Sequence, residues 1–135
     1  MNVSYNTAKL AKGKGYNEFC YDKYCTKECG RYYWQKEGGL VIAINHLDET
    51  CCSNHGIEEI NLINAPLQYE LQKWLRESHN TDCIVFPNGL GKYSYKLYIY
   101  NKDFDIIEAY RIYDTYEEAL EEALIAALNL IKNEN

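Results

Sequence analysis

Two short segments of the sequence each carry a pair of potential metal ligands followed by a glycine. The first reads Cys25-x3-Cys29-Gly and the second reads Cys52-x2-His55-Gly. Zinc prefers four cysteine or histidine ligands in a tetrahedron, and two such segments joined by a hairpin are typical of a zinc ribbon. Because a hairpin is expected over residues 31–45, these four residues form a candidate zinc site.

Several features speak against zinc at these positions. The first spacing is three residues instead of two, and one of the four ligands is a histidine. Cysteine is also often buried as a small hydrophobic residue, and Cys20 and Cys51 could replace either cysteine ligand. We therefore assign no metal-binding, cofactor-binding or catalytic residue, and a zinc-stabilised module remains the alternative interpretation.

A nucleophilic cysteine is a second chemistry that these residue types allow. Cys52 and His55, with Asp48 or Glu58 as the orienting acid, would supply the three roles. However, the chain has six cysteines and three histidines, so chance pairings are easy. No signature of a nucleophile turn surrounds Cys52. We predict that the protein is not an enzyme.

Length and charge limit the classes of partner. The 135 residues suit one compact domain, which we place at 1–135, and the formal net charge is −6. Residues 61–135 carry twelve acidic and seven basic side chains, which disfavours nucleic acid and anionic membranes as partners. No apolar run has the length of a signal peptide or a membrane span. We expect a cytoplasmic protein whose cysteines are thiols or metal ligands.

The first half of the chain predicts a short helix and a hairpin. The helix starts at Ser4 or Asn6, turns Leu10 and Ala11 inward, and stops at the glycines of 13–15. Residues 31–45 have two β-rich runs around Gly38-Gly39 and predict a β-hairpin. The stretch 46–64 is loop-like, with a short strand expected at 60–63.

The second half has clearer periodicity. Residues 65–79 predict a helix with proline in its first turn and Asn80 past its end, and one inward stripe contains Leu67, Leu71, Trp74 and Leu75. Three strand-like runs follow at 82–86, 92–100 and 104–113. The turn residues between them predict a three-stranded antiparallel meander.

A final helix is predicted by a capping box formed by Thr115 and Glu118. Its apolar face contains Tyr116, Leu120, Ala123, Leu124, Ala127, Leu128 and Ile131. Its water-facing side contains Glu117, Glu121, Glu122 and Asn129. Paired glutamates at this spacing indicate a solvated helix face instead of general acids.

Together these elements predict an α+β fold. We expect an antiparallel sheet, built from the hairpin and the three-stranded meander, with the central and C-terminal amphipathic helices packed on it. The order helix, three strands, helix also occurs in double-stranded RNA-binding domains. The last helix begins with acidic residues, however, and Lys73 and Arg76 alone make no basic patch.

Three segments resemble a family of small uncharacterised proteins of Bacteroidetes bacteria and their phages and prophages. They are YNTAKLAKGKGYNE at 5–18, APLQYELQKWLRE at 65–77 and YEEALEEAL at 116–124. The resemblance covers about a third of the chain and implies a cytosolic protein of bacterial or phage origin. It implies no catalytic activity, and the cysteine-rich region is not a feature that it explains.

The leading functional hypothesis is a small, non-enzymatic accessory or protein-interaction domain that is phage- or prophage-associated. The chain contains fourteen tyrosines. We interpret most of them as sheet residues, and a tyrosine-rich binding face is the alternative. The expected partner is a protein of unknown identity, and neither nucleic acid nor a membrane is expected.

Overall fold

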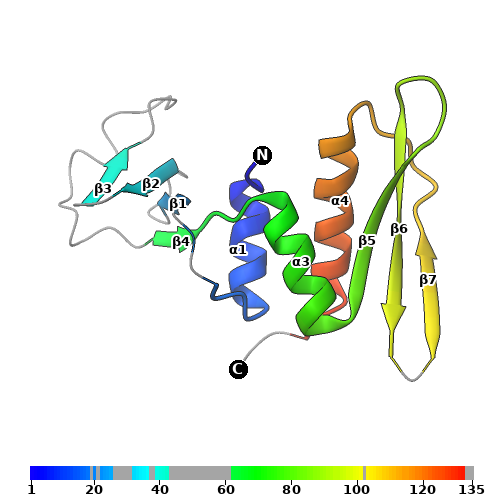
Figure 1. Ribbon diagram of the computed structural model, residues 1–135, viewed down its shortest axis with the longest axis horizontal. Coiled ribbons are helices and arrows are strands. Elements are labelled where there is room, and N and C mark those ends of the chain that lie inside the picture. Colours follow the sequence, from blue (N-terminus) through cyan, green and yellow to red (C-terminus); the bar gives the residue numbers. More distant parts are fainter. Residues whose placement is uncertain are drawn as a thin grey trace.

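The computed structural model describes residues 1–18, 20, 22–25, 32–36, 39–42, 62–101 and 103–132, with the backbone alone at 22–25, 32–36, 39–42 and 62 (Figure 1). The helices are α1 (Tyr5–Gly13), α3 (Gln68–His79) and α4 (Tyr116–Asn129). The strands are β1 (Asp22–Cys25), β2 (Tyr32–Lys36), β3 (Gly39–Ile42), β4 (Leu62–Asn64), β5 (Thr81–Pro87), β6 (Tyr93–Tyr100) and β7 (Phe104–Glu108).

The predicted three-stranded meander is confirmed. Strands β5, β6 and β7 pair in this order, each antiparallel to the next. The turn between β5 and β6 contains Gly89 and Gly91, which adopt φ angles of 101° and 66°. Glycine adopts such angles without steric cost, so this turn is encoded locally.

The third strand is shorter than predicted. Ala109 still donates to Tyr95 O, at 3.1 Å, but the next bridge joins Tyr113 to Tyr93. Residues 110–112 therefore oppose a single residue of β6, and they form a bulge. The regular pairing of β7 ends at Glu108 for this reason.

The two long helices have the ends that their capping residues predict. The Thr115 hydroxyl oxygen accepts from the backbone N–H of Glu118 at 3.1 Å, which caps α4. Asn80 ends α3 in the left-handed conformation with φ 51°. One detail differs, because α3 begins at Gln68, so Pro66 precedes the helix instead of lying in its first turn.

Helix α1 begins after Ser4, whose hydroxyl oxygen accepts from the Thr7 backbone N–H at 3.2 Å. Ala8 and Ala11 are buried, whereas Leu10 is half-buried. None of the described helices is long and apolar enough to cross a membrane.

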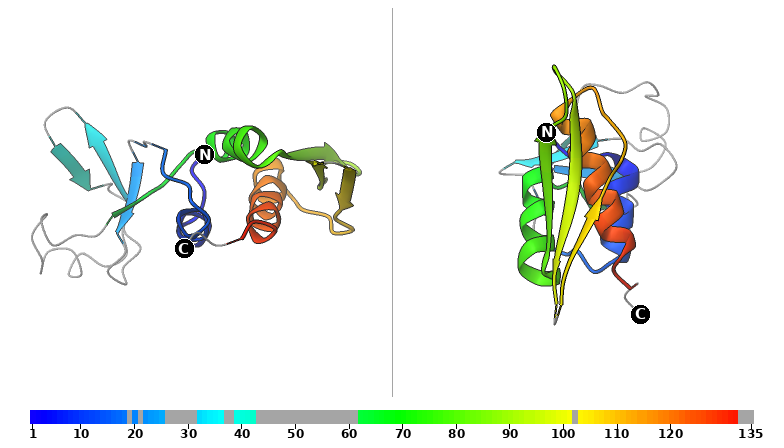
Figure 2. Two further views of the ribbon diagram at one scale, coloured as in Figure 1. Left: turned by 90° about the horizontal axis from the view of Figure 1, so that it is seen from below. Right: turned by 90° about the vertical axis from the view of Figure 1, so that its right-hand side faces the viewer.

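The helices form a layer on one face of the β5–β6–β7 sheet. Helix α3 contacts β5, and α4 contacts both β5 and β6. Figure 2 shows α1 on the far side of α3 and α4 from the sheet, which agrees with the contacts of α1 with α4. The core lies among the helices and this sheet, and its largest fully buried aliphatic side chains are Val3, Leu71, Leu75, Leu97, Leu124 and Leu128.

The strands of the first half belong to a different sheet. They pair in the order β3–β2–β1–β4, and β2 and β3 are antiparallel neighbours. The prediction of one sheet made of hairpin and meander is therefore wrong, because the described strands of the two sets form separate sheets. Residue 38 of the expected Gly38-Gly39 turn lies outside the described residues, so the hairpin turn stays a prediction.

Candidate interaction surface

One face of the β5–β6–β7 sheet is left open by the helices. Along β5, Thr81 and Cys83 are buried against the helix layer, while Asp82 between them is half-buried and Ile84 after them is exposed. Side chains alternate between the two faces of a sheet, so the registers assign each residue of β6 and β7 to one face. The open face carries Asp82, Ile84, Phe86, Ser94, Lys96, Tyr98, Tyr100, Phe104, Ile106 and Glu108.

Apolar and aromatic side chains predominate on this open face. We call six of them the open-face patch: Ile84, Phe86, Tyr98, Tyr100, Phe104 and Ile106. Phe104 is 55% exposed, Tyr100 and Ile106 are each 48% exposed, and Ile84 is 37% exposed. The outer face of an antiparallel sheet is usually polar, so this composition is unusual for a face in water.

The patch is ordered by contacts among its own side chains. The ring of Phe104 lies 5.6 Å from the ring of Tyr98 and 5.2 Å from that of Tyr100, measured between centroids. Lys96 Nζ lies 5.2 Å from the centroid of the Phe86 ring and 3.3 Å from the carboxylate of Glu108. These contacts hold the rings in place before any partner arrives.

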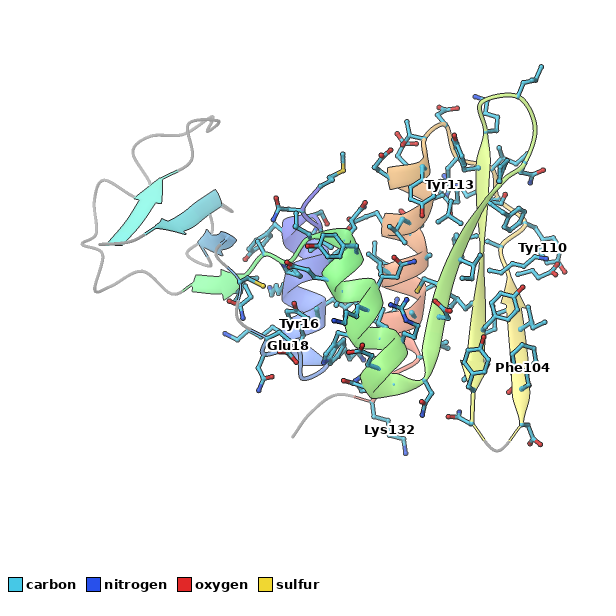
Figure 3. The ribbon with its side chains drawn as sticks, in the orientation of Figure 1. Tyr16, Glu18, Phe104, Tyr110, Tyr113 and Lys132 are labelled. Carbon is cyan, nitrogen blue, oxygen red and sulfur yellow. The ribbon has the colours of Figure 1, made fainter. Side chains whose placement is uncertain are left out.

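The bulge limits the patch at one end. Ser94 is fully buried although it points to the open face, because its hydroxyl donates to Arg111 O at 2.8 Å. The Asn88 side-chain amide donates to the same hydroxyl at 2.9 Å. Beyond this cover the bulge exposes Tyr110 almost completely, at 93% (Figure 3).

Strand β7 is exposed on both faces. All five of its residues are exposed, including Ile107, which lies on the helix side and is 41% exposed. The reason is that α4 packs over β5 and β6 and does not extend over β7. Strand β7 is also the last strand of its sheet, so its outer edge pairs with no described strand.

The candidate zinc ligands are mostly outside the described residues. Cys25 is the last residue of β1, and only its backbone is described. Cys29, Cys52 and His55 lie outside the described residues, as does Cys51. Among the residues that the structure describes, no group of three or more His, Cys, Asp or Glu could hold a metal ion.

The candidate nucleophile is also not described. Cys52, His55, Asp48 and Glu58 all lie outside the described residues. The hypothesis of a catalytic cysteine at this place therefore stays untested.

Two described cysteines lie in the core. Cys20 is buried, and its Sγ lies 3.7 Å from the hydroxyl of Tyr16. Cys83 is fully buried, and its Sγ lies 3.7 Å from the carbonyl oxygen of Ala123. Burial raises the pKa of the Cys83 thiol to about 12, and the nearby carboxylate of Asp82 acts in the same direction. Cys83 is therefore a neutral thiol at physiological pH and a structural residue.

Glu121 was predicted to lie toward water, but its carboxylate is hydrogen-bonded to residues at the starts of α1 and α3. One of its carboxylate oxygens accepts from the Ser4 backbone N–H at 3.2 Å and from the hydroxyl of Thr7. The other oxygen accepts from Gln68 Nε2 at 3.2 Å. Glu121 thus joins α4 to the starts of α1 and α3. Its neighbours Glu117 and Glu122 are exposed, as predicted.

Comparisons with known proteins found no family model, curated protein or solved structure that matches the chain.

The open-face patch was not identified in the sequence, although a signal was present. A strand with one solvent-exposed face alternates apolar and polar residues. The runs DCIVF and FDIIE instead carry apolar residues at positions that point to both faces. Such runs indicate burial on both faces. In this fold the second face finds no covering element among the described residues.

Proposed function

We propose that the protein is a small, non-enzymatic protein-interaction domain that binds a protein partner through the open-face patch. The observation that carries this proposal is the cluster of half-exposed aromatic and aliphatic side chains on a sheet face that no described element covers. Interface cores are enriched in tyrosine and phenylalanine, which supply large contact areas at a small cost in conformational entropy.

The sequence resemblance adds an expectation about the partner. It implies a protein of Bacteroidetes bacteria or their phages, and a small phage or prophage protein often acts by binding a host or viral protein. The apolar side chains of the patch would be complementary to a partner surface that is apolar at its centre. The mixed charges at its margin, Asp82, Lys96 and Glu108, suit a polar rim.

The experiment compares Ile84→Glu with Leu90→Glu in capture from a Bacteroidetes cell lysate. Ile84 lies in the patch and is opposite Lys96, so a glutamate there is compatible with the fold. Leu90 is 99% exposed in the β5–β6 turn, outside the patch. We expect a protein captured by the wild type and by Leu90→Glu to be lost, roughly tenfold or more, with Ile84→Glu. A charge placed in a desolvated apolar contact costs more than 1.4 kcal/mol.

Two results would contradict the proposal. One is the recovery of nothing above background at several salt concentrations. The other is a captured protein that Ile84→Glu retains as well as Leu90→Glu does. Equal melting temperatures of the two variants would establish that any difference lies in binding.

A zinc-stabilised module with Cys25, Cys29, Cys52 and His55 is the second candidate. One observation favours it: β1 ends at Cys25 opposite Leu62, where β4 begins, and the start of β2 and the end of β3 lie at the same end of the sheet. Cys25 therefore lies at the end of the sheet where β1 and β3 end and where β2 and β4 begin.

Native mass spectrometry of protein purified without a metal-binding tag tests this candidate. A zinc module should carry one zinc ion per chain, and chelation should remove the metal and part of the folded structure together. The candidate is wrong if the protein carries no metal. After denaturation, its thiols should then react with a thiol reagent to the same extent as those of a metal-free standard.

A further inference from the structure

At alternate residues of β7, the backbone groups on the outer edge pair with no strand that the structure describes. Tyr100 N donates to Asn80 O at 2.8 Å, and Ala109 N donates to Tyr95 O at 3.1 Å. Hydrogen-bonded pairs alternate along an antiparallel ladder, so these two bonds fix the direction of every backbone group in β6 and β7. It follows that Phe104, Ile106 and Glu108 direct their N–H and C=O groups away from β6.

These three residues define how a further strand can add to the edge. A second copy of β7, running antiparallel, pairs all three when Ile106 lies opposite Ile106 of that copy. Phe104 of each chain is then opposite Glu108 of the other. A shift by one residue would place outward groups opposite inward ones, and a shift by two would shorten a ladder of only five residues.

The charges of β7 are compatible with this register. No acidic residue lies directly opposite another, because Asp105 is opposite Ile107 and Glu108 is opposite Phe104 of the second copy. Glu108 also remains paired with Lys96 of its own chain, whose Nζ lies 3.3 Å from its carboxylate. Like charges directly opposite each other would oppose pairing, and this register avoids them.

The same register covers the side chains that a single chain exposes. The two-fold axis of such a pair is perpendicular to the sheet, so both open faces lie on one side and both helix layers on the other. Phe104 and Ile106 of the two chains then lie side by side on the open face. On the other side each Ile107, which α4 leaves exposed, gains the second chain as a neighbour.

We propose that two copies of this chain associate through β7, antiparallel and centred on Ile106, to form a continuous six-stranded sheet. The dimer contact is made by the backbone edge of β7, whereas the proposed partner is assigned to the side chains of the open-face patch, of which Phe104 and Ile106 lie at this edge. A five-residue ladder is small beside a standard interface of about 800 Å² per partner. The dimer is therefore weak and depends on protein concentration.

Sedimentation equilibrium over about 10 μM to about 1 mM tests the association. The average mass of the wild type should rise with concentration from 15.8 kDa toward twice that value. Ile106→Asp and Ile106→Lys each place two like charges opposite each other at the centre of the pair. Each variant alone should associate roughly tenfold more weakly than the wild type.

Mixing the two variants tests the register. An equimolar mixture of Ile106→Asp and Ile106→Lys should regain a dimer, because only a register with residue 106 opposite itself brings the two new charges together. Ile106 is half-exposed on an edge strand, so both variants should keep the fold, as circular dichroism can verify. Leu90→Asp, outside the contact, should associate as the wild type does.

The proposal is overturned if the wild type remains at 15.8 kDa across the whole range, or if the mixed variants stay monomeric while the wild type dimerises. Ile84→Glu separates this proposal from the proposed function. That variant should lose the captured partner and keep the dimer, since Ile84 lies on β5, two strands from the edge. Loss of both properties in Ile84→Glu would overturn the assignment of the dimer to the β7 edge.

Discussion

Cys83 is an example of a cysteine whose role is set by its surroundings. Its side chain faces α4 from β5, it is fully buried, and its thiol has a pKa raised to about 12. The unfolded chain ionises the same thiol near its ordinary pKa of 9.0. Because the folded state holds the proton more tightly, the contribution of this thiol to stability is fully present below pH 9 and is lost as the pH rises toward 12.

We expect the free energy of unfolding of the wild type to fall more steeply above pH 9 than that of Cys83→Ala. By pH 12 the wild type should have lost on the order of 4 kcal/mol more of its free energy of unfolding than Cys83→Ala. Chemical denaturation at successive pH values measures it. Burial also raises the pKa of Tyr16 and of Tyr95, so both proteins lose stability in this range. Parallel curves for the two proteins would contradict the structural role of the buried thiol.

At the scale of the elements, Glu121 connects three helices. It accepts from Ser4 and Thr7 at the start of α1 and from Gln68 at the start of α3. The Gln68 amide also donates to the carbonyl oxygen of Glu117 at 3.0 Å. Backbone N–H groups at a helix start lack partners inside the helix, and the Glu121 carboxylate accepts one of these at α1, from Ser4. A negative charge at that end also interacts favourably with the helix dipole.

Glu121→Ala should therefore destabilise the protein by about 1–3 kcal/mol, because three donors lose their acceptor in a half-buried place. Glu122→Ala is the matched control, since Glu122 is the next residue on α4 and is exposed. Its effect should stay within about 0.5 kcal/mol. Urea denaturation of both variants measures the difference, and equal stabilities would show that the contacts of Glu121 contribute little.

The helix ends were predictable because their signals are local. Ser4, Thr115 and Asn80 act on backbone groups within a few residues of themselves. The end of β7 was not predictable by the same means. It depends on the hydrogen bond from Ser94 to Arg111 O, which joins residues seventeen positions apart, and nothing in the local pattern indicates such a contact. Glu121 was missed for the same reason, as its partners lie on other helices.

At the scale of the whole molecule, the sequence predicted the strands better than their partners. Alternation and β-rich composition predict strands within 31–45 and at 82–86, 92–100 and 104–113, but they do not indicate which strands share a sheet. The chain divides them into two sheets. The meander was predictable because its strands are consecutive and joined by short turns.

The open-face patch depends on the same global arrangement. Both faces of β5 carry apolar residues, and the placement of α3 and α4 decides which face is buried. The sequence could indicate that tyrosines lie in strands, and Tyr93, Tyr95, Tyr98 and Tyr100 do lie in β6. It could not indicate which of them remain uncovered, because that is a property of the packed layers.

The position of α1 has a consequence for the order in which the chain folds. Ser4 N contacts a carboxylate 117 positions away, and Val3 N donates to Pro66 O at 2.9 Å. A nine-residue helix is marginal in water without a packing surface. During synthesis α1 therefore lacks its packing surface until α3 and then α4 have left the ribosome. Because its contacts come from distant partners, α1, which is synthesised before α3 and α4, should become stable only after they have formed.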